Sequence, residues 1–383
     1  MESPLKKTSV QSVLPKKKRN DKAKEEKKTE ENILTYDVLR IIFEYLSAKD
    51  LTYAAHLCRI WRDAANKELA TRRTPECHLG NCEFRITQTE NENSYQRLLC
   101  NKLRIKPAFA FICAKMEKDR EWTPNGCFCA ALPKSCITIQ MGGYQVIEND
   151  SNIPESRYGV TVSAFFPQIP GLSLETYQLH FNSFKESTDE DIHSHANKIV
   201  KQLLPPDDGS ENKRCIILLA NEHGYKFNRL VLKGIQKKYK PGTISLWGGI
   251  CVDLRQCHDF KDEFPTCSRQ IYWTSMSITS PSLESYSLVI PQSCRQELQM
   301  IEKLEKLRKN IKLKKLSLGF MFACIERVKR KDLEIKVFKK VFPEVPLFGL
   351  HGDGECGLDT LSTKRDSELH HSYSTIFLIL TYS

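Results

Sequence analysis

Apolar residues between positions 33 and 46 recur every three or four residues, which is the spacing of one face of an α-helix. The stripe consists of Ile33, Leu34, Val38, Leu39, Ile42, Phe43 and Leu46. A polar break follows, with Asp50 as the expected N-cap of a second helical stretch that contains Leu51 and Trp61. Such a short helical hairpin cannot bury a core of its own, so we expect it to pack on another part of the chain.

The rest of the chain, residues 77–383, alternates short apolar runs with longer helical patterns. The predicted strands are 109–114, 136–141, 159–166, 215–220, 244–247, 271–278, 286–290, 318–324, 346–350 and 374–380. The predicted helices are 189–204, 228–238, 292–312 and 332–342. The sequence shows no clean internal repeat. We therefore predict an α+β protein, in which a small helical hairpin precedes a larger mixed α/β domain.

Residues 1–31 contain ten Lys or Arg against six Asp or Glu and few large apolar side chains. Such a segment buries too little to offset its ordering entropy, so we expect a disordered basic tail. Its run Pro15-Lys16-Lys17-Lys18-Arg19 is either a nuclear import signal or simply a solvated stretch. On this basis the chain is expected in the cytoplasm and the nucleus.

The formal net charge is +11, and the sequence contains fifteen cysteines. The cysteines follow no repeating framework, and no secretory leader is recognised, so we expect free thiols. No apolar run approaches the roughly eighteen residues of a membrane-spanning helix, so no membrane association is expected. Basic residues are not interleaved with aromatic ones, which argues against direct binding of nucleic acid.

The segment from Leu34 to Ala65 resembles an F-box, the motif that docks a Skp-family adaptor. The matching positions are Leu34, Ile42-Phe43, Tyr45-Leu46, Asp50-Leu51, Cys58-Arg59 and Trp61-Arg62, and Thr35 departs from the family's Pro. The alternative is an ordinary amphipathic helix pair. The resemblance implies an F-box at residues 32–72 that binds the adaptor, and through it a cullin scaffold. The side chains implied in adaptor binding are Leu34, Val38, Ile42, Phe43, Leu46, Leu51, Cys58 and Trp61.

The following residues resemble the FIST domain, named for F-box and intracellular signal transduction. The resemblance rests on the segments 165–172, 318–327, 342–349 and 352–357, and Glu326 departs from the family's Gly. It implies a FIST N-terminal-like region at 77–240 and a FIST C-terminal-like domain at 241–383. The layout is that of F-box proteins that receive substrates for a ubiquitin ligase.

A candidate ligand or substrate surface follows from the same resemblance, because FIST domains of prokaryotic sensors look like modules that bind small ligands. Its residues are Cys324, Arg327, Gly352, Gly354 and Glu355. The alternative is a structural Arg–Glu pair beside a tight turn. For Cys324, either Arg327 lowers the pKa of an emerging thiol, or the thiol is buried and inert.

Motifs for catalysis are absent from the sequence. Cys77-His78 with Cys82 is only half a zinc site, and Cys127 and Cys129 do not complete it at a suitable spacing. There is no His-Glu-x-x-His, no Gly-x-Ser-x-Gly and no phosphate-binding glycine loop. We therefore expect a non-catalytic adaptor that needs no cofactor or metal and binds protein substrates. The alternative function is a ligand-sensing module whose F-box-like hairpin is only structural.

Overall fold

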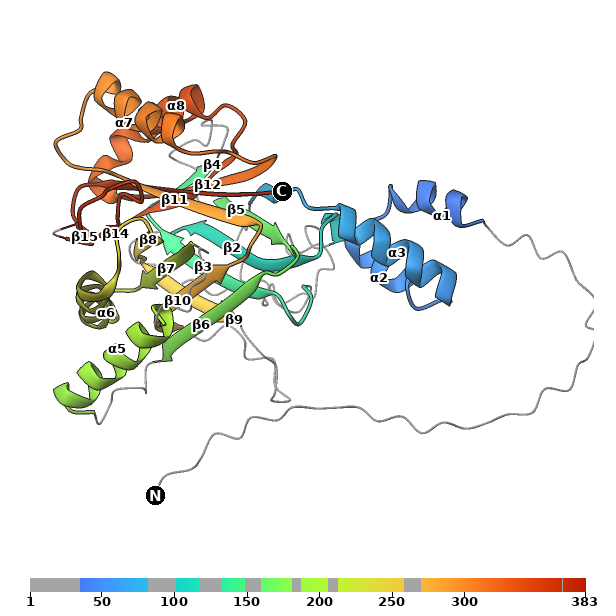
Figure 1. Cartoon of the computed structure of the whole chain (residues 1–383), viewed down its shortest axis with the longest axis horizontal. Helices are drawn as coiled ribbons and strands as arrows, with labels where there is room; N and C mark the ends of the chain where they lie inside the picture. Colours follow the sequence, from blue (N-terminus) through green and yellow to red (C-terminus); the bar gives the residue numbers. More distant parts are fainter. Residues whose placement is uncertain are drawn as a thin grey trace, which may run out of the picture.

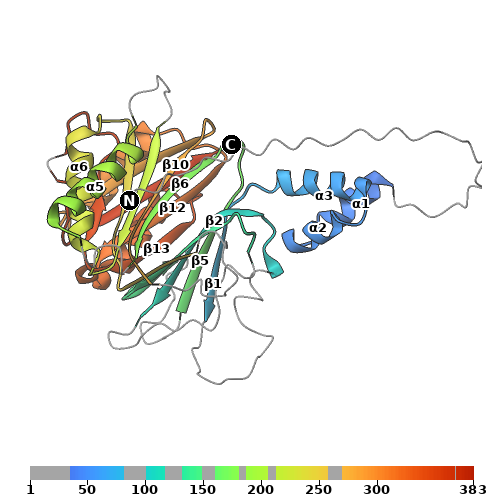
Figure 2. The same cartoon turned by 90° about the horizontal axis from the view of Figure 1, so that it is seen from below.

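The computed structural model describes residues 35–81, 101–116, 132–148, 160–180, 187–205, 213–257, 270–366 and 368–383. The predicted tail 1–31 and Leu34 lie outside these residues. The described part consists of a small helical bundle beside a larger body of strands and helices (Figure 1; Figure 2). The predicted α+β class is therefore confirmed.

The bundle is formed by three helices, α1 (Tyr36–Phe43), α2 (Ala48–Ala54) and α3 (Arg59–Thr71). Ser47 caps α2, since its hydroxyl accepts the Asp50 N–H at 3.1 Å. The predicted cap, Asp50, is instead the third residue of the helix. The bundle interior is small and apolar, and it consists of Leu39, Phe43, Leu51, Ala54, Ala64 and Ala65.

Three mixed sheets make up the larger body. The first has the strand order β1-β5-β2-β3-β9, the second β15-β14-β8-β7-β10-β6, and the third β11-β16-β12-β13-β4. The bounds of the strands of the first sheet are β1 (Glu76–Asn81), β2 (Pro107–Lys115), β3 (Ile137–Gly143), β5 (Val160–Pro167) and β9 (Asp253–Cys257).

The second sheet carries two helices on its outer face, α5 (Asp189–Leu203) and α6 (Tyr225–Lys238). Thr188 and Asp191 form a reciprocal capping box at the start of α5. The strands are β6 (Ser173–His180), β7 (Arg214–Ala220), β8 (Ile244–Ile250), β10 (Ile271–Thr279), β14 (Glu355–Gly357) and β15 (His370–His371).

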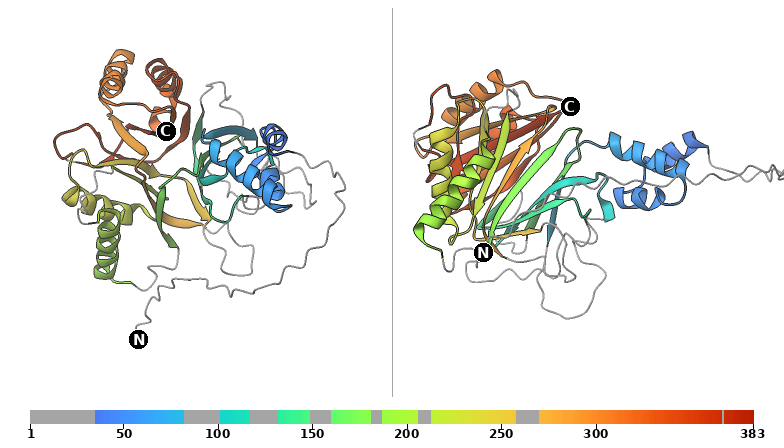
Figure 3. Two further views of the ribbon diagram at one scale, coloured as in Figure 1. Left: turned by 45° about the vertical axis from the view of Figure 1, so that its right-hand side comes forward. Right: turned by 60° about the horizontal axis from the view of Figure 1, so that its bottom comes forward.

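The third sheet is covered in the same way by α7 (Glu297–Asn310) and α8 (Lys331–Val341), which the short 3-10 helix η3 (Ile325–Arg330) precedes. The two helix pairs lie on separate sides of the body (Figure 3). The strands are β4 (Gln145–Glu148), β11 (Leu283–Ile290), β12 (Leu316–Cys324), β13 (Leu347–Gly352) and β16 (Thr375–Tyr382).

The strand orders reveal three structural repeats. The orders β1-β5-β2-β3, β6-β10-β7-β8 and β11-β16-β12-β13 are equivalent. In each repeat the strand that comes fourth along the chain is missing from this order, because it pairs in another sheet. Thus β4 pairs with β13, β9 with β3, and β14 with β8, which closes a cycle of strand exchange. The sequence does not show this repeat, because it lies in the pairing pattern of the strands rather than in shared side chains.

The exchange of strands joins the repeats into one body with a shared core. One aromatic ring from each sheet meets at its centre, with ring centroids of Phe111, Trp247 and Phe320 separated by 5.6–6.4 Å. All three side chains are fully buried. The predicted boundary at 240/241 falls between α6 and β8, inside the second repeat. The division into FIST N- and C-terminal-like parts stays a prediction.

Candidate functional site

The helical bundle exposes an unusual number of apolar side chains. Among the described residues, eleven large hydrophobic side chains are exposed, and seven of them lie between residues 38 and 60. Tyr45 is 79% exposed, Ile41 60% and Ile42 41%. We call this set the apolar face; it consists of Val38, Ile41, Ile42, Tyr45, Tyr53, Leu57 and Ile60. Solvated apolar residues gathered in so short a segment indicate a surface that binds another protein.

The predicted adaptor-binding residues divide between this face and the bundle interior. Val38 and Ile42 are exposed, whereas Phe43 and Leu51 are fully buried. Leu46 and Trp61 are half-buried, and the Trp61 ring stands edge-on to Phe43 with the centroids 5.4 Å apart. Cys58 is exposed at the N-terminus of α3. Phe43 and Leu51 cannot touch a partner while the bundle is folded, so any contribution to binding is made by holding the helices together.

The sequence did not single out Ile41, Tyr53, Leu57 or Ile60 as surface residues. Apolar residues occupy both sides of α1, and periodicity alone does not say which side is the interior. The adjacent pair Ile41-Ile42 was the available signal, because two neighbouring residues on a helix cannot both face a small core.

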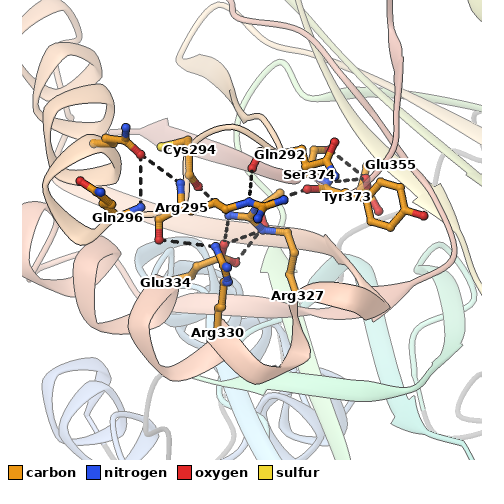
Figure 4. A network of polar contacts seen from close by, with 12 residues as sticks. Gln292, Cys294, Arg295, Gln296, Arg327, Arg330, Glu334, Glu355, Tyr373 and Ser374 are labelled. Carbon is orange, nitrogen blue, oxygen red and sulfur yellow. Dashed lines mark hydrogen bonds and ion pairs between the residues drawn. The ribbon is translucent and has the colours of Figure 1, made fainter.

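The candidate ligand residues of the larger body lie at the ends of β12, β13 and β14 and in η3, but they are packed in its interior. Figure 4 shows Arg327 and Glu355 of this set. Arg327 pairs with Glu334 on α8, with Nε 2.7 Å from Oε1. Its other donors reach the carbonyls of Tyr373 at 3.2 Å and Cys294 at 3.3 Å. Burial raises the pKa of the Glu334 carboxyl, and the Arg327 guanidinium opposes that shift. The pair fixes η3 and α8 to the third sheet.

Glu355 does not pair with Arg327; its partner is Ser374. Its Oε2 accepts the Ser374 N–H at 3.1 Å and the Ser374 hydroxyl at 2.8 Å. Burial raises the pKa of Glu355 to about 7. The pKa of the Cys324 thiol is also raised, first by burial and then by the charge of Glu355. The raised pKa and the burial of Cys324 favour the alternative of a buried thiol, and no lowering of its pKa by Arg327 is seen.

Gly352 allows β13 to pass close to β8. A Cβ at Gly352 would lie 2.2 Å from the carbonyl oxygen of Ile250, so a side chain has no room there. The Gly354 carbonyl accepts the Ile250 N–H at 2.8 Å. Gly352 therefore serves strand packing, whereas a side chain at position 354 would make only ordinary contacts, the nearest 3.4 Å from His370 Nε2. Whether the cluster also forms a ligand or substrate surface stays a prediction.

The described residues contain neither a cluster of metal ligands nor a membrane-spanning helix. No group of three or more His, Cys, Asp or Glu side chains there is arranged to hold a metal ion. Cys82, Cys127 and Cys129 lie outside the described residues. None of the helices in the described ranges is both long and apolar enough to cross a bilayer.

Comparison with known proteins agrees with the geometry of the bundle. Residues 36–75 match the F-box-like family. The chain is also 24% identical to F-box only protein 22 of Homo sapiens, and equally to that of Pongo abelii, over 90% of its own length and 92% of theirs. The FIST assignment of residues 77–383 is not part of these matches and stays a prediction. The chain thus carries an F-box-like domain on its helical bundle and is similar, over most of its length, to F-box only protein 22.

Proposed function

We propose that the chain is the substrate-recognition subunit of a Skp–cullin–F-box ubiquitin ligase. In this role the apolar face binds a Skp-family adaptor, and the larger body binds proteins that are to be ubiquitinated and degraded by the proteasome. The observation that carries the proposal is the apolar face itself. It lies on the three helices and the turns between them, within the residues that match the F-box-like family, and it is solvated in the isolated chain.

The chemistry of the apolar face suits a protein interface. Specific interfaces bury on the order of 800 Å² on each partner, with aromatic and aliphatic anchors near the centre. Tyr45 and Tyr53 supply the aromatic anchors, and Ile41, Ile42 and Leu57 supply the aliphatic ones. Phe43 behind them stiffens α1, which lowers the entropy lost when a partner binds.

The larger body needs no catalytic residue for this function. A receptor accelerates ubiquitin transfer by holding a substrate lysine near a loaded carrier, which raises the effective concentration of the two reactants. The body is joined by strand exchange between its three sheets, so it offers a rigid surface for this purpose. The alternative function, ligand sensing, is disfavoured because Arg327 and the Oε2 of Glu355 are engaged in internal contacts, although Glu355 Oε1 is buried without a hydrogen bond among the described residues.

The experiment compares two full-length proteins in cells treated with a proteasome inhibitor. Affinity capture of the parent chain should recover the adaptor, the cullin and a set of proteins that accumulate under the inhibitor. Capture of the Ile42→Glu, Tyr45→Glu variant should recover those accumulated proteins without adaptor or cullin. Equal recovery of adaptor by both proteins would contradict the proposal.

Localisation in cytoplasm and nucleus is tested in the same cells by imaging the parent and a variant in which Lys16, Lys17 and Lys18 are replaced by Ala.

A further inference from the structure

The bundle and the larger body are connected by more than the chain that leaves α3. The residues 101–106 that lead into β2 run beside the bundle, and we call them the strap. Leu103 and Ile105 of the strap are buried on the outer face of the first sheet, together with Ile112 and Phe165. The strap is therefore anchored to the larger body by apolar packing, and its remaining residues are available for contacts with the bundle.

Three hydrogen bonds run between the strap and the region around α2. The Ala48 N–H donates to the Leu103 carbonyl at 2.8 Å, and the Lys49 ammonium donates to Asn101 Oδ1 at 2.8 Å. The Arg104 guanidinium donates to the Glu44 carbonyl. The first bond uses a backbone donor at the start of α2, where a helix has no internal acceptor to offer. The strap thus supplies the acceptor that the helix lacks.

Arg72 joins the same elements from the other side. Its guanidinium donates to the carbonyls of Phe43 and Leu46, each at 2.7 Å, and to the strap's Arg104 carbonyl at 2.9 Å. Its Nε is held by Glu68 at 2.7 Å. The carbonyls at and beyond the end of α1 have no helical partner, and a cation there is favoured by the helix dipole. One side chain therefore ties α1, α3 and the strap together.

The chain that leaves the bundle is also held at two points. Glu76 Oε1 accepts the N–H groups of Arg104 and Ile105, each at 2.9 Å, at the first residue of β1. The Tyr382 hydroxyl, at the end of β16, donates to the Arg73 carbonyl at 2.5 Å. Contacts from the first sheet and from the third sheet thus converge on residues 72–76, the place where a flexible receptor would bend.

We propose that the strap locks the F-box-like bundle against the larger body in one orientation through its hydrogen bonds to Ala48 and Glu44, with Arg104 as the positioning side chain. The chain then acts as a rigid spacer between the adaptor and the substrate-binding surface, which restricts ubiquitin transfer to the lysines that the fixed geometry brings within reach. This consequence rests on the proposed function, whereas the fixed orientation does not. The apolar face is solvated and takes no part in these contacts, so the lock is separable from adaptor binding.

The test uses the full chain and a pair of substitutions that cut the lock without entering the bundle core. Ala48→Pro removes the donor to Leu103, and proline is favoured at the first position of a helix, so α2 is preserved. Arg104→Ala removes the bond to Glu44 from the side of the strap. Lys102→Ala is the matched control, because Lys102 is an exposed cation of the strap with no contact to the bundle. Arg72 is left intact, since its removal would also weaken the end of α1.

The orientation is measured by pulsed dipolar spectroscopy between spin labels on unnatural amino acids at the exposed positions Asp63 and Lys340. The parent and the Lys102→Ala control should give one narrow distance distribution. The Ala48→Pro, Arg104→Ala variant should give a distribution broadened to about twice that width, as for a jointed linker. A broad distribution in the parent, or an unchanged narrow one in the double variant, would overturn the proposal.

The consequence is measured by self-ubiquitination with purified adaptor, cullin, RING subunit and ubiquitin-conjugating enzyme. The double variant should bind the adaptor within about twofold of the parent, since distant sites act independently. Mass spectrometry should map the ubiquitin to a few lysines in the parent and the control, and to many more lysines in the double variant. The same pattern in all three proteins would refute the positioning role. If the parent itself does not bind the adaptor, the proposed function is refuted, but the distance measurement stays valid.

Discussion

Replacing Arg327 by Met should destabilise the larger body strongly, because the substitution removes one partner of a buried ion pair. The Glu334 carboxylate would keep the Thr375 hydroxyl at 2.8 Å but lose its counter-charge. Breaking a buried pair in this way costs about 3–5 kcal/mol. The carbonyls of Tyr373 and Cys294 would also lose a donor, which accounts for about 1 kcal/mol each of that total.

The second variant separates the two contributions. Adding Glu334→Gln to Arg327→Met removes the uncompensated charge while keeping the shape of the side chain. The double variant should therefore regain about 1–3 kcal/mol of the loss and keep only the cost of the two carbonyls. The free energy of unfolding is measured by urea denaturation at pH 8, where an exposed carboxyl is fully ionised. Destabilisation by Arg327→Met of less than about 1 kcal/mol would refute the structural role of the pair and favour a ligand-binding one.

Two further predictions concern single buried side chains. Phe43→Ala should cost about 3–5 kcal/mol and increase amide hydrogen exchange throughout residues 36–71, because the bundle core contains only six buried side chains; protection equal to the parent would contradict this. Burial raises the pKa of Glu355 to about 7. The stability that its protonated form contributes is complete below the ordinary carboxyl pKa and is lost as pH rises to about 7. The free energy of unfolding of Glu355→Gln should therefore rise, relative to that of the parent, by up to about 3 kcal/mol between pH 4.5 and pH 8. A difference between the two proteins that does not depend on pH would contradict the shift.

Much of the secondary structure follows from local patterns in the sequence. The predicted strand 318–324 is part of β12, and the predicted helix 189–204 corresponds to α5. The helix shows a clear period of three to four in its apolar residues, whereas the strand was recognised as a short continuous apolar run that is buried on both faces. The strands β1, β4, β6, β9, β14 and β15 were missed, of which β6 and β9 show the reason. β6 is a largely solvated edge strand, and β9 is a short segment that carries Arg255 and Gln256, so neither shows a strong apolar alternation.

The candidate sites show where sequence patterns stop being informative. Leu39 and Phe43 are interior whereas Val38 and Ile42 are solvated, although all four are apolar and lie on one short helix. Their division depends on where α3 packs, which is a tertiary property. The same holds for Arg327, whose partner proved to be Glu334 rather than Glu355 because α8 folds back over β12. The exchange of β4, β9 and β14 between sheets is likewise set by long-range pairing.

The most direct test of the account is the affinity of the purified chain for a purified Skp-family adaptor. The Ile42→Glu, Tyr45→Glu variant places two charges on the apolar face without entering the bundle core, so its helices should stay folded. Leu298→Glu is the matched control, because Leu298 is a 71% exposed apolar side chain on α7, outside the bundle. Calorimetry should give tight binding for the parent and the control and a loss of at least about 2 kcal/mol of binding free energy for the double variant. Equal affinity in all three proteins, or no binding by the parent, would contradict the claim that the bundle is an adaptor-binding F-box.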